Sequence, residues 1–470
     1  MFEKILIANR GEIAVRIIRA CKEMGIQTVA IYSEIDKKSL HVRLADESYC
    51  IGKASSVESY LRYHDIVVAA LESHAGAIHP GYGFLSENAE FAKLCRTSEI
   101  EFIGPSPESL RLMGDKSTAR ETMRQARVPV VKGSNRPLAT EKDVLRAAKK
   151  IGYPVLIKPS AGGGGKGMRI VHHERDLASA FHSSQAESQA AFGSNEIYLE
   201  HYIRNARHIE FQILADNSGS VIHLGERECS VQRRHQKLVE EAPSPRLDPA
   251  LRARMGKTAV KVAKAVDYQG AGTVEFLIGD DSKFYFIEMN TRIQVEHPVT
   301  EAATGIDLVK AQICIAANEP LGLRQKDIQI SGHSIECRIN AEDPQHDFMP
   351  SPGKLRGLCL PGGPGVRVDT HVYSGYEIPH YYDSLLTKII VHAHNRTIAI
   401  DRMKRALDEF SVENVKTTAP YLARIMNDHR FRSGEYGTDL IEKLKEDDEN
   451  HHLKGFVHKL MESFHLWHDF

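Results

Sequence analysis

The sequence lacks several features that would point to a secreted, membrane-bound or nucleic-acid-binding protein. Its seven cysteines are odd in number and form no C-x-x-C pair, so free thiols in a reducing compartment are expected. No apolar run approaches the length needed to cross a bilayer. The 61 basic and 62 acidic residues nearly cancel, and a net charge of −1 gives no electrostatic basis for binding nucleic acid or a membrane. Basic residues must therefore gather locally if the protein binds an anion.

The start of the chain leaves no room for a signal peptide, because Met1–Lys4 leads directly into the apolar segment Ile5–Ala8. We therefore expect a cytoplasmic location. A chain of 470 residues is too long for one ordinary compact core, so several domains are expected, and no internal repeat or low-complexity tract interrupts them.

Strands and helices alternate along the first hundred residues. Ile5–Ala8, the amphipathic stretch Glu12–Met24 and the strand Thr28–Tyr32 form a β-α-β unit, and the pattern continues to about Gly104. Glycine- and proline-rich turns along the rest of the chain predict the domain boundaries. We expect an N-terminal domain at residues 1–114, a helical linker at 115–130 and a lid at 131–202. A large third part follows at 203–446, and an amphipathic tail helix at 447–470.

The most informative segment is Glu288–Glu296, in which polar residues occupy every second position. In an extended backbone alternate side chains share a face, which predicts one face formed by Glu288, Asn290, Arg292, Gln294 and Glu296. Two acids, a guanidinium and two amides are the composition of a binding site. A surface strand with alternating charges is the alternative, but the preceding Phe284–Ile287 is too apolar for a free surface.

A second acidic strand, Gly272–Leu277, lies just upstream of this segment. The turn residues Gly279–Ser282 between the two predict a hairpin that brings Glu275 beside Glu288. Carboxylate and amide oxygens are hard ligands that suit Mg²⁺ with bound phosphates. A divalent metal and a nucleoside triphosphate are therefore expected here.

A glycine run, Gly162–Gly167, follows the apolar strand Pro154–Lys158. Consecutive glycines let backbone N–H groups approach an anion closely, and Lys158 and Lys166 add positive charge. The run fits neither the Walker A pattern nor the Rossmann fingerprint. A flexible hairpin tip is the alternative to our interpretation, which is a mobile lid that folds over a triphosphate.

Together these parts resemble the ATP-grasp superfamily, in which two α/β lobes clamp ATP. More narrowly, the sequence is similar to biotin carboxylase from about residue 2 to about residue 446, on four motifs: Asn9–Ala14, His79–Asn88, Gln232–Lys237 and Arg292–Glu301. The resemblance implies an α/β, three-domain ATP-grasp enzyme with a doubly wound N-terminal domain, a mobile glycine-loop lid and a C-terminal α+β domain.

The resemblance also implies the residues that bind ATP and metal. Magnesium or manganese, as two ions, would be held by Glu275, Glu288 and Asn290. ATP would be bound by Lys116, Lys158, Gly163, Gly164, Gly165, Lys166, Gly167, Glu200, His201, Ile203, His208, Gln232, His235 and Leu277. The family usually has lysine where His201 stands, and backbone groups make the adenine contacts there, so the change should be tolerated.

The resemblance further implies a bicarbonate site formed by Lys237, Arg292, Gln294, Val295 and Glu296, with Glu296 as general base. Arg338 would face the ureido oxygen of biotin, and Tyr82 would face its ring. The alternatives are a structural salt bridge from Arg338 to Glu336 or Glu342, and simple loop packing for Tyr82.

The expected partners follow from what the chain does not contain. A biotin acceptor carries a lysine between two methionines, whereas the only Met-Lys pair, Met403-Lys404, lies in the helical pattern Ile398–Phe410. We therefore expect biotin on a separate carrier protein, a separate carboxyltransferase subunit and a homodimer of this chain. Acetyl-CoA is the favoured final acceptor. Pyruvate or another 2-oxo acid is the alternative.

Two other functions compete with this one. Another ATP-grasp ligase, such as a carbamoyl-phosphate synthetase half, should lack the segments His79–Gly83 and Arg292–Glu296, and both are present. A non-catalytic nucleotide-binding scaffold should have lost Glu296, Lys237 or Arg338, and none is lost. The sequence therefore favours a catalyst.

The tail carries apolar residues spaced for one face of a helix, at Phe456, Val457, Leu460, Met461 and Phe464. Such a helix either caps its own third domain or docks a partner subunit. A tail of this kind resembles the subunits of two-part pyruvate carboxylases.

Overall fold

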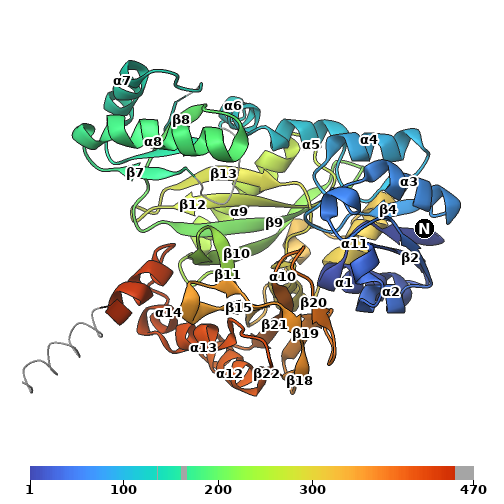
Figure 1. Ribbon diagram of the computed structural model, residues 1–470. Helices are drawn as coiled ribbons and strands as arrows, with labels where there is room; N and C mark the ends of the chain where they lie inside the picture. Colours follow the sequence, from blue (N-terminus) through green and yellow to red (C-terminus); the bar gives the residue numbers. More distant parts are fainter. Residues whose placement is uncertain (135, 160–166, 450–470) are drawn as a thin grey trace, which may run out of the picture.

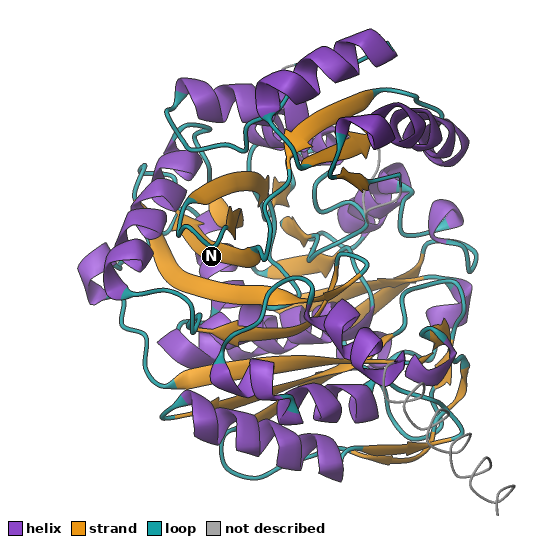
Figure 2. Cartoon of the chain, turned by 90° about the vertical axis from the view of Figure 1, so that its left-hand side faces the viewer, coloured by secondary structure: helices purple, strands orange, loops and turns teal. Residues whose placement is uncertain are grey.

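The computed structural model describes residues 1–134, 136–159 and 167–449 (Figure 1). Three main sheets organise these residues, and helices lie on the outer sides of the strands (Figure 2). No helix within the described ranges is long and apolar enough to span a membrane. The predicted glycine-loop residues 162–166 and most of the predicted tail helix, residues 450–470, lie outside the described residues.

The N-terminal part is built on a parallel sheet with the strand order β3-β2-β1-β4-β5. Its strands are β1 Lys4–Ile7, β2 Gln27–Tyr32, β3 Glu47–Cys50, β4 Ala77–His79 and β5 Glu101–Phe102. Helix α1 (Gly11–Glu23) packs on the face that carries Ile5, whereas α3 (Tyr63–Glu72) and α4 (Ala89–Thr97) pack on the face that carries Leu6. Helices on both faces and a reversal of strand order make this the doubly wound arrangement that the sequence predicts.

A smaller sheet, with the order β7-β6-β8, lies at the upper left of Figure 1. It consists of β6 Val155–Pro159, β7 Arg169–Val171 and β8 Ile197–His201, and it is covered by α7 Glu141–Ile151 and α8 Glu174–Phe192. Val144 of α7 and Phe181 of α8 pack against Val155 in its core.

The largest sheet is antiparallel throughout and has the strand order β13-β12-β9-β10-β11-β14-β21-β19. Its strands are β9 Arg207–Ala215, β10 Val221–Arg233, β11 Gln236–Ala242, β12 Gly270–Ile278, β13 Phe284–Asn290, β14 His333–Asn340, β19 Val366–Thr370 and β21 Leu385–Ala393. The pairing of β11 with β14 makes one continuous sheet of the strands between residues 207 and 290 and those between residues 333 and 393.

Helices cover this sheet on both faces. Helix α9 (Pro249–Lys264) packs on β9 and β12, while α12 (Arg396–Glu409) and α13 (Ala419–Asn427) pack on β14 and β21. Helix α10 (His297–Thr304) lies on the opposite face, against Ala242 and Ile390. The predicted helix 398–410 corresponds to α12.

One prediction about local structure is wrong. The strand expected to run from Glu288 to Glu296 ends at Asn290, and the chain turns before α10 begins at His297. Pro298 lies in the first turn of α10, where backbone N–H groups have no partner within the helix, so its lack of an N–H costs no helical hydrogen bond. The side chains of Gln294 and Glu296 therefore reach the site from a turn and a helix N-cap, not from one face of a strand.

Candidate active site

A cleft of about 1770 Å³ opens between the small sheet, the large sheet and the turn before α10. Nearly all of the predicted site residues within the described part of the chain line it. They are Tyr82, Lys116, Lys158, Glu200, His201, Ile203, His208, Gln232, His235, Lys237, Glu275, Leu277, Glu288, Asn290, Arg292, Gln294, Val295, Glu296 and Arg338. Gly167 is described but is not among the lining residues, and Gly163–Lys166 fall outside the described ranges.

Lys237 is the centre of the charged cluster in this cleft. Its Nζ donates to Glu296 Oε1 at 2.6 Å, Glu210 Oε2 at 2.5 Å, and Gln294 Oε1 and Glu275 Oε1 at 3.1 Å each. Burial alone would lower the pKa of Lys237, but the surrounding carboxylates outweigh burial and raise that pKa well above its usual value. The ammonium is therefore a fixed positive charge.

Glu296 lies between two cations. Arg338 Nη2 donates to its Oε2 at 2.8 Å, opposite the contact with Lys237. Burial would raise the pKa of Glu296, yet these two cations hold it far below its usual range. Glu296 is thus a carboxylate, the form that a general base requires.

Arg338 pairs with Glu240 as well as Glu296. The salt bridges to Glu336 or Glu342, considered as a structural alternative for Arg338, are absent among the described residues. Burial dominates at Glu240 and raises its pKa to about 7 despite the guanidinium. Arg338 is therefore held at the cleft by two acids, Glu240 and Glu296.

The acidic hairpin forms as predicted. Glu275 of β12 lies directly opposite Glu288 of β13. Among the described residues the side chain of Glu288 has no hydrogen bond or ion pair, and burial together with the charge of Glu275 raises its pKa. Asn290 Nδ2 donates to Glu275 Oε1 at 2.8 Å. A half-buried carboxyl without an ion-pair partner, beside a second carboxylate and an amide, is a donor set that fits Mg²⁺ or Mn²⁺.

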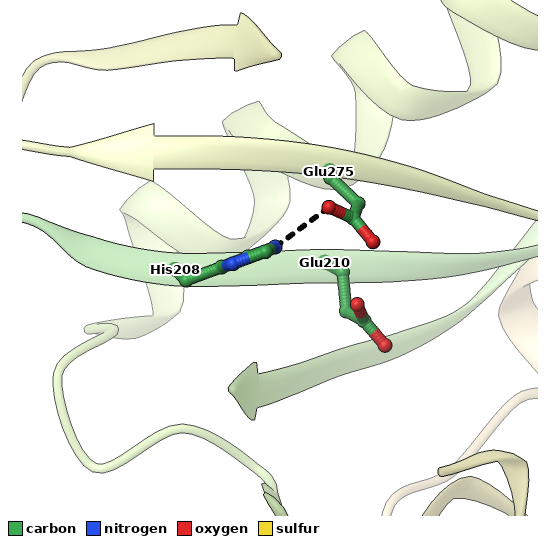
Figure 3. A group of neighbouring side chains, drawn as sticks. All are labelled: His208, Glu210 and Glu275. Carbon is green, nitrogen blue, oxygen red and sulfur yellow. Dashed lines mark ion pairs between the residues drawn. The ribbon is translucent and has the colours of Figure 1, made fainter. Parts of the chain in front are cut away.

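A neighbouring group of possible ligands is better explained as an ion-pair cluster. Figure 3 shows His208 and Glu210 on β9 with Glu275 on the adjacent β12, and their ligand atoms lie within 4.8 Å of one another. His208 Nε2 contacts Glu275 Oε2 at 2.8 Å. Burial would lower the pKa of His208, but Glu275 outweighs it and raises the pKa. The contact with the carboxylate favours a proton on Nε2, and a ring nitrogen that carries a proton cannot ligate a metal.

Arg292 and Gln294 extend the cluster toward the N-terminal part. Arg292 Nε donates to Glu87 Oε2 at 3.0 Å, and its Nη2 donates to Asn290 Oδ1 at 3.1 Å. Gln294 Nε2 donates to Glu275 Oε1 at 3.0 Å. Glu296, Glu275, Asn290, Lys237 and Arg292 therefore belong to one connected network of hydrogen bonds.

The opposite end of the cleft carries the residues that the resemblance assigns to the nucleotide. Lys158 Nζ lies 2.6 Å from Glu200 Oε2, and Arg120 also pairs with this carboxylate. Lys116 is exposed at the start of α6 (Lys116–Gln125). Lys116, Arg120 and Lys158 thus bring three cations to the lining of this end of the cleft.

The histidines predicted at the nucleotide end have different surroundings. Gln232 Nε2 lies 2.7 Å from His208 Nδ1. His235 sits at the tip between β10 and β11 with φ +64°, and His201 Nδ1 lies 3.2 Å from the carbonyl oxygen of Gly152. Only His208 belongs to the central ion-pair network.

Several charged residues of the site escaped the sequence analysis, namely Glu12, Glu210, Glu240 and Lys388. Glu210 could have been found, because His208, Glu210 and Gln212 alternate with apolar residues along β9. Glu240 could not, because a bulge changes the phase of β11. Val231 pairs with Val239 while Gln232 pairs with Lys237, so one extra residue puts Lys237 and Glu240 on the same face.

Comparisons with known proteins identify the family of the chain. Family models for the N-terminal and C-terminal domains of biotin carboxylase match residues 1–110 and 336–443, and the model for the ATP-binding domain of the carbamoyl-phosphate synthase L chain matches residues 115–324. A biotin carboxylase of Nostoc is 58% identical over 443 residues, covering 94% of this chain and 99% of its own length.

Two further relatives are informative. The 2-oxoglutarate carboxylase small subunit of Hydrogenobacter thermophilus is 51% identical over 471 residues, covering 99% of this chain and all of its own length. A crystal structure of the biotin carboxylase domain dimer of the 2-oxoglutarate carboxylase from that organism, in complex with MgADP, ADP and bicarbonate, matches with a TM-score of 0.91. It is 53% identical and covers 94% of this chain and 98% of the solved chain. The chain belongs to the biotin carboxylase family.

Proposed function

We propose that this cleft catalyses the ATP-dependent carboxylation of carrier-bound biotin by bicarbonate, through carboxyphosphate. The observation that carries the proposal is the Lys237 ammonium held between Glu296, Gln294 and Glu275, with Arg338 on the far side of Glu296. It combines a cationic place for a small anion with an ionised base. Enzymes of this family work as subunits with a carboxyl carrier and a carboxyltransferase.

Bicarbonate is a planar anion that a guanidinium and an ammonium can bind together. Lys237 and Arg292 supply these two groups. In the structure Lys237 donates a hydrogen bond to Glu296, and Arg292 donates one to Glu87. When bicarbonate draws Lys237 toward itself, Glu296 loses part of the positive field that holds its pKa down. The carboxylate then becomes a stronger base at the moment when it must take the bicarbonate proton.

The deprotonated bicarbonate oxygen attacks the γ-phosphorus of ATP, and ADP leaves. Lys116 and Lys158 lie at the end of the cleft where the phosphates would bind. Glu275, Glu288 and Asn290 would hold a divalent ion, which spreads the charge of the transferring phosphoryl group when bound.

Carboxyphosphate breaks down to CO₂ and phosphate within the cleft. The released phosphate takes the proton from biotin N1′, and N1′ then attacks CO₂ to form carboxybiotin. Arg338 lies beside Glu296 and faces the cleft, where a fixed cation would stabilise negative charge on the ureido oxygen. Tyr82 lines the same region from the loop after β4. Biotin bound there would lie close to the CO₂ that is released.

The acceptor of the carboxyl group has two candidates. Acetyl-CoA is the acceptor favoured by the sequence analysis. A 2-oxo acid is the second, and one observation favours it: the relative that covers 99% of this chain is the small subunit of a 2-oxoglutarate carboxylase, whereas the Nostoc biotin carboxylase covers 94%. Purifying the native complex and identifying the carboxyltransferase subunit decides between them. A carboxyltransferase subunit that carboxylates acetyl-CoA would contradict the assignment of a 2-oxo acid as the acceptor.

A further inference from the structure

A fully buried lysine lies where the N-terminal, ATP-binding and C-terminal parts of the chain meet. Lys388 is on β21, and its Nζ donates to the carbonyl oxygen of Val295 at 2.7 Å. The same Nζ lies 2.9 Å from Glu12 Oε1 on α1. The side chains of Lys388 and Glu12 are 0% and 1% exposed, so neither can touch a substrate in this conformation.

The contacts of this pair lead to both halves of the active site. Val295 immediately precedes Glu296, the general base. The hydroxyl of Tyr82 donates to Glu12 Oε1, the same oxygen that faces Lys388. An unbroken chain of contacts therefore runs from Tyr82, on the proposed biotin side, through Glu12 and Lys388 to the backbone beside the base.

The other charges around Lys388 show that it is not simply paired with every acid nearby. Asp369 is held by both arms of Arg367, at 2.8 Å and 2.7 Å. Neither carboxyl oxygen of Glu336 has a hydrogen-bond partner, and burial raises its pKa well above the usual range. Among the described residues, Lys388 Nζ contacts the carbonyl oxygen of Val295 and the carboxylate of Glu12, and these two contacts lead to the cleft.

We propose that Lys388 is a positioning residue that fixes the Val295–Glu296 turn directly and Tyr82 through Glu12, so that the bicarbonate and biotin sides of the site share one support. The inference rests on the proposed function of the cleft. A positioning role for Lys388 differs from that of a merely structural ion pair in one respect. Loss of Lys388 should weaken the binding of bicarbonate and of biotin and leave the binding of ATP unchanged.

Three variants separate the contact of Lys388 with Val295 from its contact with Glu12. Lys388→Met removes the bond to Val295 and the partner of Glu12, so the KM values for bicarbonate and for free biotin should both rise by about tenfold, equivalent to roughly 1.4 kcal/mol each. Glu12→Met removes the acceptor of Tyr82 and the acid partner of Lys388, but it leaves the bond from Lys388 to the carbonyl oxygen of Val295 in place. It should raise the KM for biotin alone. The KM for ATP should stay unchanged in both.

The double variant Glu12→Met/Lys388→Met guards against misfolding, because it removes the two buried charges together. It should reproduce the rise in the KM for bicarbonate seen with Lys388→Met. Arg396→Met is the matched control, since it breaks the buried ion pair with Glu241 away from the cleft. It should lower the melting temperature without changing any KM.

Initial rates of ADP formation with free biotin, at varied bicarbonate, biotin and ATP, give all of these constants. An unchanged KM for bicarbonate in a folded Lys388→Met or double variant overturns the proposal, as does an equal rise in all three KM values. If the unmodified protein shows no bicarbonate- and biotin-dependent ADP formation, the proposed function of the cleft fails instead.

Discussion

Replacing Glu296 by glutamine is the most direct perturbation of the proposed chemistry. The change keeps the size of the side chain and removes its negative charge. Glu296 accepts hydrogen bonds from Lys237 at 2.6 Å and Arg338 at 2.8 Å, and both cations keep other partners, Glu210 and Glu240. We therefore expect the variant to fold with its cleft intact.

The expected magnitude comes from the loss of one positioned base. Such a base contributes about 10² to 10⁴ in rate, so kcat should fall by that factor, or roughly 2.7 to 5.5 kcal/mol in the barrier. Glu296 has no contact with Lys116 or Lys158 among the described residues, so the affinity for ATP should change little.

The assay is ADP release at saturating ATP, bicarbonate and free biotin, combined with direct measurement of ATP binding. Glu301→Gln is the matched control, because Glu301 lies in α10, forms ion pairs with Arg16 and Arg367, and does not line the cleft. Turnover by Glu296→Gln within a few-fold of the unmodified enzyme would refute the assignment of the base.

Three further predictions concern metal, pH and the tail. Glu288→Gln should raise the Mg²⁺ concentration needed for half-maximal ADP release by about tenfold or more, and an unchanged requirement would remove Glu288 from the metal site. Burial would raise the pKa of Glu241, but His333 and Arg396 outweigh it and lower the pKa to about 2. Its ionised form should therefore contribute about 3 kcal/mol of stability above pH ~4.5 that is lost as the pH falls toward 2. The difference in unfolding free energy between the unmodified protein and Glu241→Gln should shrink on acidification, and a difference independent of pH would contradict this. Truncation after Glu449 should preserve ADP release with free biotin but weaken association with the carrier-bearing subunit, as measured by co-purification; undiminished association would show that the tail does not dock.

Local sequence patterns were sufficient for the acidic hairpin. The turn residues and the alternation of polar and apolar side chains place Glu275 opposite Glu288, as the structure has it. The same alternation failed beyond Asn290, because Pro298 and the N-cap position of Glu296 start a helix there. A period of two cannot show where a strand stops, although the residues that it singled out still converge on one cleft.

The partners of the site residues were beyond the reach of such patterns. Glu240 joins Arg338 because a bulge at the start of β11 shifts its face, and bulges have no reliable sequence signal. Lys388 reaches Val295 across the pairing of β14 with β21, a contact between residues 93 positions apart. A buried charge of this kind is recognised only when the groups that compensate it are seen around it.

The central claim is that one cleft couples ATP cleavage to both bicarbonate and biotin. Its most direct test is ADP formation by the purified chain with ATP and Mg²⁺, with bicarbonate and free biotin added separately and together. We expect that biotin stimulates ADP formation only when bicarbonate is present, and that radiolabelled bicarbonate appears in carboxybiotin. ADP formation at the same rate without bicarbonate, or without any carboxybiotin, would contradict it.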